Sequence, residues 1–303
     1  MKLTNKFHLP QALVDAVPPA RPFIDGETSV TRLFRPPQIN YLEYAYWDEL
    51  TEDVSDLIYA LLGTAVHQML ERTQPANAFT EERLSCDFSG FKLTGTSDLL
   101  EGHPLSDGHR LDDYKVTSVY KATVAELSTD WINQLMGYSF LWAEAGFTVE
   151  QQRVVALLRD FSLPERKRRR QRGDDSYPEV GVVVLDLSGH IPPANRWADI
   201  IAENIIGYQQ AIDGKYRECI PTERWERPSV WAVNKCGRKS AVRLLPSERE
   251  AGQWLDDNGC SPTTHSIQER KGESVRCQDY CRAAPFCSQY RAIREAQGDR
   301  SYL

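Results

Sequence analysis

The sequence predicts an α/β fold with a mixed central sheet flanked by helices, followed by a loop-rich, cysteine-containing C-terminal region. Segments with apolar residues three and four positions apart, typical of one-sided helices, alternate with short runs of strand-forming residues. Their order is helix, strands, helix, two strands and helix, which favours a sheet sandwiched by helices. The remaining C-terminal part has few apolar residues and crowds three of the seven cysteines into eleven residues.

Length and composition fit a globular protein with one large domain or two smaller ones, since 41% of the 303 residues are hydrophobic and 26% charged. We expect an irregular, proline-rich segment over 1–50, a core over 51–214 and the cysteine-containing region over 215–303. No apolar run approaches the length needed to cross a bilayer, and the N-terminus lacks the apolar centre of a signal peptide. We therefore expect no membrane association and a cytoplasmic location.

The net charge of −7 excludes a DNA-binding protein that relies on overall positive charge. Any contact with DNA must be local. The run "ERKRRRQR" offers such a patch through Arg168, Arg169 and Arg170. A solvated loop explains the same run equally well.

The elements follow in order along the chain. The spacing of apolar residues predicts a helix over 54–73, which places His67 and Glu71 one turn apart. The stretch 82–102 reads as a hairpin with a turn near Ser89 and Gly90, and 109–118 as a further strand. We assign His103 and His109, next to this strand, to a solvated loop.

The second half of the predicted core contains two helices and two strands. A helix over 122–144 ends just before Gly146, a common helix terminator. Residues 149–161 and 179–187 predict strands, and 194–213 predicts another one-sided helix.

The run "LDDYKVTS", Leu111 to Ser118, carries charges that an ordinary buried strand avoids. Residues two apart on a strand share a face, so Asp113 and Lys115 project together, away from Asp112 and Tyr114. One interpretation is a surface ion pair, which contributes little. The other is half of a hydrolytic metal site, in which the carboxylate binds a cation and the lysine assists the attacking water.

A metal site needs more oxygen ligands, and Asp98 supplies one from the end of the preceding strand. Mg²⁺ and Mn²⁺ favour carboxylates, carbonyl groups and water. Asp98, Asp113, a strand carbonyl such as that of Val116 and water molecules would make an octahedral set.

Asp98 followed by Asp113-x-Lys115 resembles the metal-binding core of the PD-(D/E)XK nucleases. Further segments resemble the RecB-like branch of that superfamily. "GTAVHQMLE" is similar to its upstream helix, whose histidine is a metal ligand, which implicates His67 with Glu71 behind it.

"QLMGY" resembles the Gln-x-x-x-Tyr helix of the same branch and implicates Gln134 and Tyr138 in positioning the substrate or the site. A lone Asp-x-Lys is common, but four segments occur here in the order expected for this branch: the helix with His67, the strand with Asp98, Asp113-x-Lys115, and the helix with Gln134 and Tyr138. The candidate catalytic residues are therefore Asp98, Asp113, Lys115, Gln134 and Tyr138.

The resemblance implies a restriction-endonuclease-like core and Mg²⁺- or Mn²⁺-dependent hydrolysis of DNA. Within the RecB-like branch we favour an exonuclease acting on single-stranded or duplex ends in recombination or repair. Such a phage-type enzyme would work in the host cytoplasm, with a recombination protein as a possible partner. The alternatives are a structure-selective or nicking endonuclease, and a non-catalytic DNA-binding or assembly subunit.

Cys277, Cys281 and Cys287 are spaced C-x3-C-x5-C, and three thiolates need a fourth ligand to hold zinc or an iron–sulfur cluster. Cysteine-rich RecB-like exonucleases hold a [4Fe-4S] cluster with three C-terminal cysteines and one near the N-terminus. Here the first gap is three residues instead of two, and the corresponding N-terminal segment has no cysteine. Cys219 is the preferred fourth ligand, ahead of Cys236 and Cys260.

Cys86 is assigned to a strand interior. We rank a [4Fe-4S] cluster ahead of Zn²⁺, and Zn²⁺ ahead of a metal-free thiol cluster. In either metal case the group would stabilise the region 215–303, which has few apolar residues to form a core.

Overall fold

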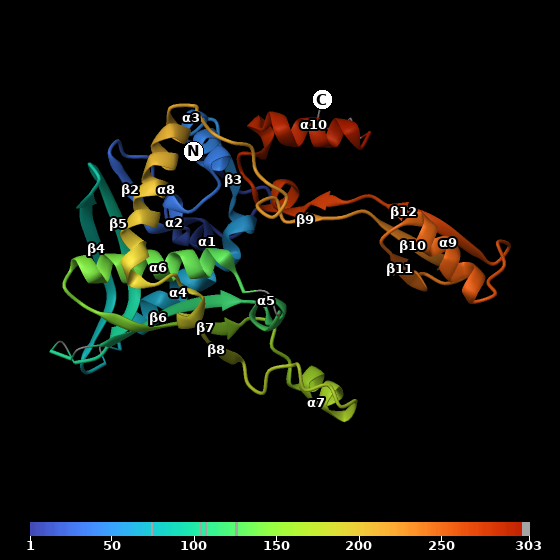
Figure 1. Ribbon diagram of the computed structural model, residues 1–303, viewed down its shortest axis with the longest axis horizontal. Helices are drawn as coiled ribbons and strands as arrows, with labels where there is room; N and C mark the ends of the chain where they lie inside the picture. The colour runs from blue at the N-terminus through green and yellow to red at the C-terminus, as the bar shows by residue number, and fades with distance from the viewer. Residues whose placement is uncertain (74, 104, 107, 125–126, 299–303) are drawn as a thin grey trace. The chain divides into compact units, whose positions relative to one another are not determined.

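The computed structural model spans residues 1–303 and describes all of them except 74, 104, 107, 125–126 and 299–303. The chain forms two compact units (Figure 1). Unit 1 comprises 1–35 and 47–215, and unit 2 comprises 36–46 and 216–303. Within the described ranges, no helix is both long enough and apolar enough to cross a membrane.

A six-stranded sheet forms the centre of unit 1, with strand order β2-β5-β6-β7-β8 and β4 paired to β5. The β2–β5 and β6–β7 pairs are parallel and the other pairs antiparallel, so the sheet is mixed as expected. A separate parallel pair joins β1 (Lys2–Thr4) to β3 (Thr51–Asp53). The strands of the large sheet are β2 (Glu27–Ser29), β4 (Ala78–Phe88), β5 (Phe91–Glu101), β6 (His109–Thr117), β7 (Val149–Leu158) and β8 (Val182–Asp186).

Helix α6 (Thr129–Glu144) supplies much of the core of unit 1. It contacts β4, β5, β6 and β7 and packs against α8 (Trp197–Ile212). Leu135, Leu141 and Trp142 on α6 are almost completely buried. The other helices of the unit are α1 (Gln11–Ala16), α2 (Val30–Leu33), α4 (Ile58–Glu71), α5 (Val119–Thr123) and α7 (Leu163–Gln171), with 3-10 turns at Val54–Leu57, Ser188–His190 and Ala194–Arg196.

Helices α6 and α4 cover opposite faces of the sheet. The indole N–H of Trp142 on α6 donates a hydrogen bond to Ser97 Oγ on β5 at 3.0 Å. The next residue on β5, Asp98, instead meets His67 of α4. Because successive strand residues point to opposite faces, this alternation places the two helices on either side of β5. The predicted α/β sandwich is confirmed.

The first 50 residues differ from the irregular segment expected there. They form β1, α1, β2, α2 and α3 (Pro37–Ala45), and β2 joins the large sheet beside β5. Val30 and Leu33, which follow β2, are buried in the core. Pro37 does not interrupt structure, because it occupies the first turn of α3, where a missing N–H costs nothing.

The helix expected over 122–144 is two helices. Thr123 ends α5, and α6 begins at Thr129 after Ser128. Residues 125–126, inside the expected helix, lie outside the described residues.

Unit 2 combines α3 with the C-terminal region. Ile39 and Leu42 of α3 are buried, Glu43 accepts a hydrogen bond from Arg282 at 2.8 Å, and the rings of Tyr46 and Phe286 stack. The C-terminal elements are an antiparallel β9–β13 pair (Glu226–Arg227 and Glu273–Ser274), a sheet of β11 (Arg243–Leu245), β10 (Val230–Lys235) and β12 (His265–Arg270), helices α9 (Glu248–Asp257) and α10 (Ser288–Ala296), a π turn at Arg276–Tyr280 and a 3-10 turn at Ala284–Phe286.

Candidate active site

The site lies where β5 and β6 separate. The two strands pair only from Leu99, opposite Asp112, to Glu101, opposite Arg110. Asp98 and Asp113 are the first residues beyond this paired segment on their strands. Both are buried, with 8% and 1% of their surface exposed.

The edge of β5 near Asp98 is open over four residues. β4 pairs along one edge of β5, so β2 and β6 share the other edge. On that edge β2 pairs with 92–94 and β6 pairs with 99–101. Residues 95–98 therefore lie in a gap between two partner strands and pair with neither of them on this edge.

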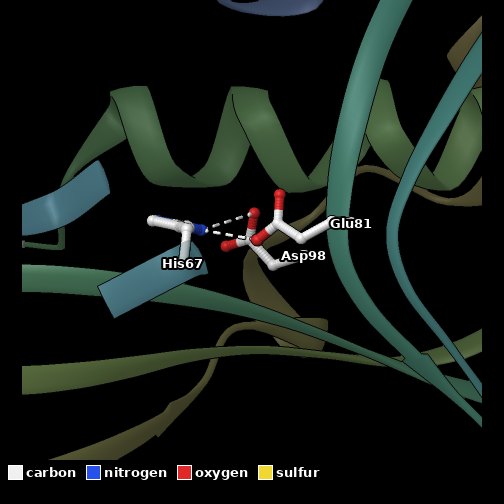
Figure 2. Close-up of side chains that lie close together, drawn as sticks. All are labelled: His67, Glu81 and Asp98. Atoms are coloured by element: carbon white, nitrogen blue, oxygen red, sulfur yellow. Dashed lines mark hydrogen bonds and ion pairs between the residues drawn. The ribbon is translucent and has the colours of Figure 1, made fainter. Parts of the chain in front are cut away.

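Three side chains from three elements converge around Asp98, as Figure 2 shows: His67 from α4, Glu81 from β4 and Asp98 itself from β5. The His67 Nδ1 atom lies 2.9 Å from Glu81 Oε1 and 3.4 Å from Asp98 Oδ1. Asp98 Oδ2 also accepts a hydrogen bond from the backbone N–H of Tyr114 at 2.7 Å, which fixes its orientation. Among the described residues, this is the one group of three ligand side chains whose donor atoms all lie within 4.8 Å.

The electrostatics of this cluster suit a cation. Hydrogen bonds to Asp98 and Glu81 raise the pKa of His67 to about 10, against the opposing effect of burial. The metal-free protein thus keeps His67 protonated, with its positive charge between two carboxylates. A divalent ion bound by neutral His67 and the same carboxylates would replace that proton as the compensating charge.

Glu81 is a candidate ligand that the sequence analysis missed. It occupies the β4 position opposite Asp98, between the pairs Thr80–Leu99 and Glu82–Ser97, where the ladder skips one pair. Its φ of 50° is in the left-handed region, which is uncommon for a residue with a side chain. This local distortion accompanies the turn of the Glu81 carboxylate toward His67.

Asp113 and Lys115 share one face of β6, as predicted. The Lys115 ammonium lies 2.5 Å from Asp113 Oδ2, and apart from it the carboxylate oxygens have no hydrogen-bond partner among the described residues. Burial raises the pKa of Asp113, the Lys115 charge opposes the rise, and the Asp98 charge adds to it. The other carboxylate oxygen, Oδ1, is buried without a partner in the part of the chain that the structure describes, which suits it to a metal ion.

Gln134 and Tyr138 lie side by side on α6, with the Gln134 amide donating a hydrogen bond to the Tyr138 hydroxyl at 2.9 Å. Burial raises the pKa of Tyr138, and the negative charge of Asp113 raises it further, so the phenol stays protonated. Its ring packs on Gly95 of β5. A Cβ at Gly95 would lie only 2.8 Å from Tyr138 Cε1, so this close approach requires glycine.

Other predicted residues stand apart from the cluster. Asp112, on the opposite face, is held by two hydrogen bonds from Arg153, both of 2.7 Å. Glu71 is exposed at the end of α4. Val116 lies in β6, and its carbonyl as a metal ligand stays a prediction.

The assignment of His109 to a solvated loop is wrong. It is 4% exposed and begins β6, and its ring nitrogens lie 3.1 Å from the carbonyl oxygens of Thr148 and His103. His103 itself is exposed.

The basic run forms helix α7 rather than a loop. Arg168 and Arg169 form ion pairs with Glu165, and Arg170 pairs with Glu179. Such exposed pairs are weak, so these arginines remain accessible to a stronger anion at modest cost.

In unit 2, Cys219, Cys277, Cys281 and Cys287 line one cavity. The Gln38 amide of α3 approaches Cys287 Sγ at 3.7 Å and accepts a hydrogen bond from the backbone N–H of Cys219 at 2.8 Å. By contrast, Cys236 is exposed and Cys86 lies in β4.

The chemistry of these four thiols suits a shared metal. Burial raises the pKa of Cys219 to about 12 and that of Cys277 to about 11, and repulsion between the thiolates adds to the rise. The cations of Arg224 and Arg276, which line the same cavity, act in the opposite direction on Cys277. A metal that binds thiolates would offset the cost of ionising them.

Comparison with known proteins yields one family. The sequence model described as the PD-(D/E)XK nuclease superfamily matches residues 72–288, which include Glu81, Asp98, Asp113 and Lys115. The chain also aligns with a structure titled "Crystal structure of SSO0001" at 16% identity and a TM-score of 0.42, over 65% of this chain and 82% of that one. No curated protein matches the chain.

Proposed function

Because the chain belongs to the PD-(D/E)XK nuclease superfamily and is thereby a metal-dependent nuclease, we propose that it degrades DNA from its ends as an exonuclease. The observation that carries the proposal is the convergence of His67, Glu81 and Asp98, near the ion pair of the buried Asp113 with Lys115. The exonuclease mode, and a role in recombination or repair of the phage type with a recombination protein as partner, rest on the likeness to RecB-like enzymes.

We assign the metal to Mg²⁺ or Mn²⁺, held by Asp98 and Asp113 with His67 and Glu81. Three carboxylates favour hard cations, and one imidazole is compatible with Mn²⁺. Such an ion supplies Lewis-acid polarisation of the phosphate and a more acidic bound water.

The protein side chains bind the DNA phosphates and offset the charge that develops on them. Lys115, held by Asp113, offsets negative charge that develops at the phosphate during hydrolysis. Tyr138 stays protonated and can donate a hydrogen bond to a phosphate oxygen, with Gln134 fixing its hydroxyl. Arg168, Arg169 and Arg170 would contact the DNA backbone farther from the site.

For the cysteine cavity we propose a structural [4Fe-4S] cluster ahead of Zn²⁺. Thiolates around one zinc ion at about 2.3 Å lie about 3.8 Å apart. No three of the cysteine sulfurs among the described residues approach within 4.8 Å of one another. A cluster that spreads its ligands over four irons fits a wider set of sulfurs.

The test compares end-labelled linear DNA with a matched covalently closed circle, in Mg²⁺, Mn²⁺ or EDTA. We expect metal-dependent loss of linear DNA only, with polarity given by the label. The Asp113→Ala variant is the matched control and should leave both substrates intact.

The other outcomes contradict parts of the proposal. Cleavage of the circle would indicate a structure-selective or nicking endonuclease. DNA binding without cleavage in any metal would indicate a non-catalytic subunit.

A further inference from the structure

A basic pocket lies beside the active site in unit 1. Its volume is about 330 Å³, at the lower end of the range for small-ligand sites, which begins at about 300 Å³. Four arginines and several hydroxyl groups line it, although the chain as a whole is acidic. The residues used below are Arg21, Arg32, Arg35, Arg83, Thr96 and Tyr138.

The basic pocket borders the open edge of β5. Thr94, Gly95 and Thr96 line it. Thr94 is the last residue paired with β2, and Gly95 and Thr96 begin the gap that ends at Asp98. Thr96 and Asp98 are two residues apart on one strand, about 6.7 Å between Cα atoms, and project to the same face. Tyr138, a candidate catalytic residue whose hydroxyl accepts a hydrogen bond from Gln134, also lines the pocket.

The charge in the pocket favours an anion. The Glu27 carboxylate approaches Arg83 only to 4.0 Å and lies at the same distance from Lys92, so it is a weak competitor for the Arg83 guanidinium. Arg32 is anchored by hydrogen bonds to the carbonyl oxygens of Arg21 and Pro22, which fix its guanidinium at the wall. Guanidinium groups bind phosphate with paired N–H donors, and the neighbouring threonine hydroxyls can donate to the same oxygens.

We propose that the basic pocket binds a phosphate group of the DNA strand being cut, one or two nucleotides from the metal-ligand cluster. This inference rests on the proposed function, since it requires a DNA strand bound at the metal-ligand cluster. One DNA strand rises about 3.4 Å per nucleotide, so the separation of about 6.7 Å between the Cα atoms of Thr96 and Asp98 corresponds to about two nucleotides. The phosphate is either a terminal monoester or an internal diester, and the two sources share this chemistry.

The test measures DNA binding in EDTA, where no cleavage occurs, by fluorescence anisotropy. The probes are short single strands with a 5′-phosphate, a 3′-phosphate or hydroxyl ends, with a closed single-stranded circle as competitor. The variants are Arg83→Ala and Arg21→Ala, both at exposed positions, which circular dichroism should show to be folded. Arg249→Ala, an exposed arginine on α9, is the matched control for the removal of one charge.

Two results support the inference. If wild type prefers one phosphorylated end and the two pocket variants lack that preference, the ligand is a terminal phosphate. If all probes and the circle bind alike and the pocket variants weaken them all about tenfold, the ligand is an internal phosphate. In that case the slope of log affinity against log salt should become shallower by about 0.7 for each phosphate that the variant no longer neutralises.

Two results overturn it. One is unchanged affinity and salt dependence in both pocket variants. The other is an equally weakened affinity in Arg249→Ala, which would show a nonspecific charge effect. Neither depends on catalysis, so failure of the nuclease assignment would be seen separately, in the cleavage assay.

Discussion

Glu81 and Asp98 face each other across the β4–β5 hairpin, and the His67 imidazole lies 2.9 Å from the first carboxylate and 3.4 Å from the second. This arrangement makes Glu81 a candidate ligand of the proposed metal on geometric grounds. Substitution of Glu81 is therefore the most direct check on the ligand set.

Glu81→Gln should weaken Mn²⁺ binding about 10- to 100-fold, because the amide keeps the shape and removes the charge. Titration calorimetry or electron paramagnetic resonance of Mn²⁺ measures this. Glu82→Gln is the matched control, since Glu82 is exposed on the same strand. Wild-type affinity in Glu81→Gln would remove Glu81 from the site.

Metal affinity should rise with pH across the neutral range. The pKa of His67 is raised to about 10 and that of Asp113 is also raised, so binding must displace at least one proton. For each displaced proton the apparent affinity increases up to tenfold per pH unit. Calorimetry in buffers of different ionisation enthalpy counts the protons, and a pH-independent affinity with no proton release contradicts this account.

The metal-free protein should become less stable as the solution becomes alkaline. The folded-state pKa of His67 lies above its value in an unfolded chain, so its contribution is complete below about pH 6.5 and is lost toward about pH 10. Thermal melts in EDTA should show the melting temperature falling over this window. In His67→Phe the fall in melting temperature caused by His67 should disappear. An identical fall in both proteins would show that protonated His67 does not stabilise the metal-free protein.

The adjacent acids Asp112 and Asp113 should behave differently when replaced. Asp112→Asn removes the buried charge that Arg153 and Arg110 pair with, and should lower the free energy of unfolding by about 1.5–3 kcal/mol, with metal binding retained in the folded protein. Asp113→Asn should abolish metal-dependent cleavage and leave the fold intact. Urea denaturation and the cleavage assay, run on both variants, separate a structural role of Asp112 from a catalytic role of Asp113. Lost cleavage in Asp112→Asn and lost stability in Asp113→Asn would contradict this division.

Cys219→Ser should abolish metal binding in unit 2. Iron and zinc analysis of anaerobically purified protein, with a visible spectrum, distinguishes a cluster from zinc. Cys236→Ser is the control, because Cys236 is exposed and does not line the cavity. Full metal content in Cys219→Ser would show that the fourth ligand lies elsewhere.

The sequence predicted the sheet, its main helices and the alternation that separates Asp113 from Asp112, because these depend on local periodicity. It missed β2 and α2, whose short segments are stabilised by packing on β5 and α6 that no local pattern reveals. Glu81 could have been found. A two-residue turn at Ser89–Gly90 fixes the hairpin register, and that register places Glu81 opposite Asp98.

The cysteine spacing indicated a shared site, but not its neighbours. Gln38 precedes Cys287 by 249 positions, and nothing local in "RPPQINYL" indicates contact with a thiol. Such a pairing depends on tertiary structure and is visible only once the chain is folded.

That same separation has a consequence for synthesis of the chain. Helix α3 leaves the ribosome 249 residues before Cys287, its partner in unit 2. At a translation rate of about 5–20 residues per second, roughly 12 to 50 seconds pass between synthesis of α3 and of Cys287. During this time Ile39 and Leu42, which are buried in the folded protein, lack the C-terminal part of unit 2. Unit 1, whose last residue is 215, is by then fully synthesised. The cysteine cavity can therefore be completed only after unit 1 has been synthesised and Cys287 has left the ribosome.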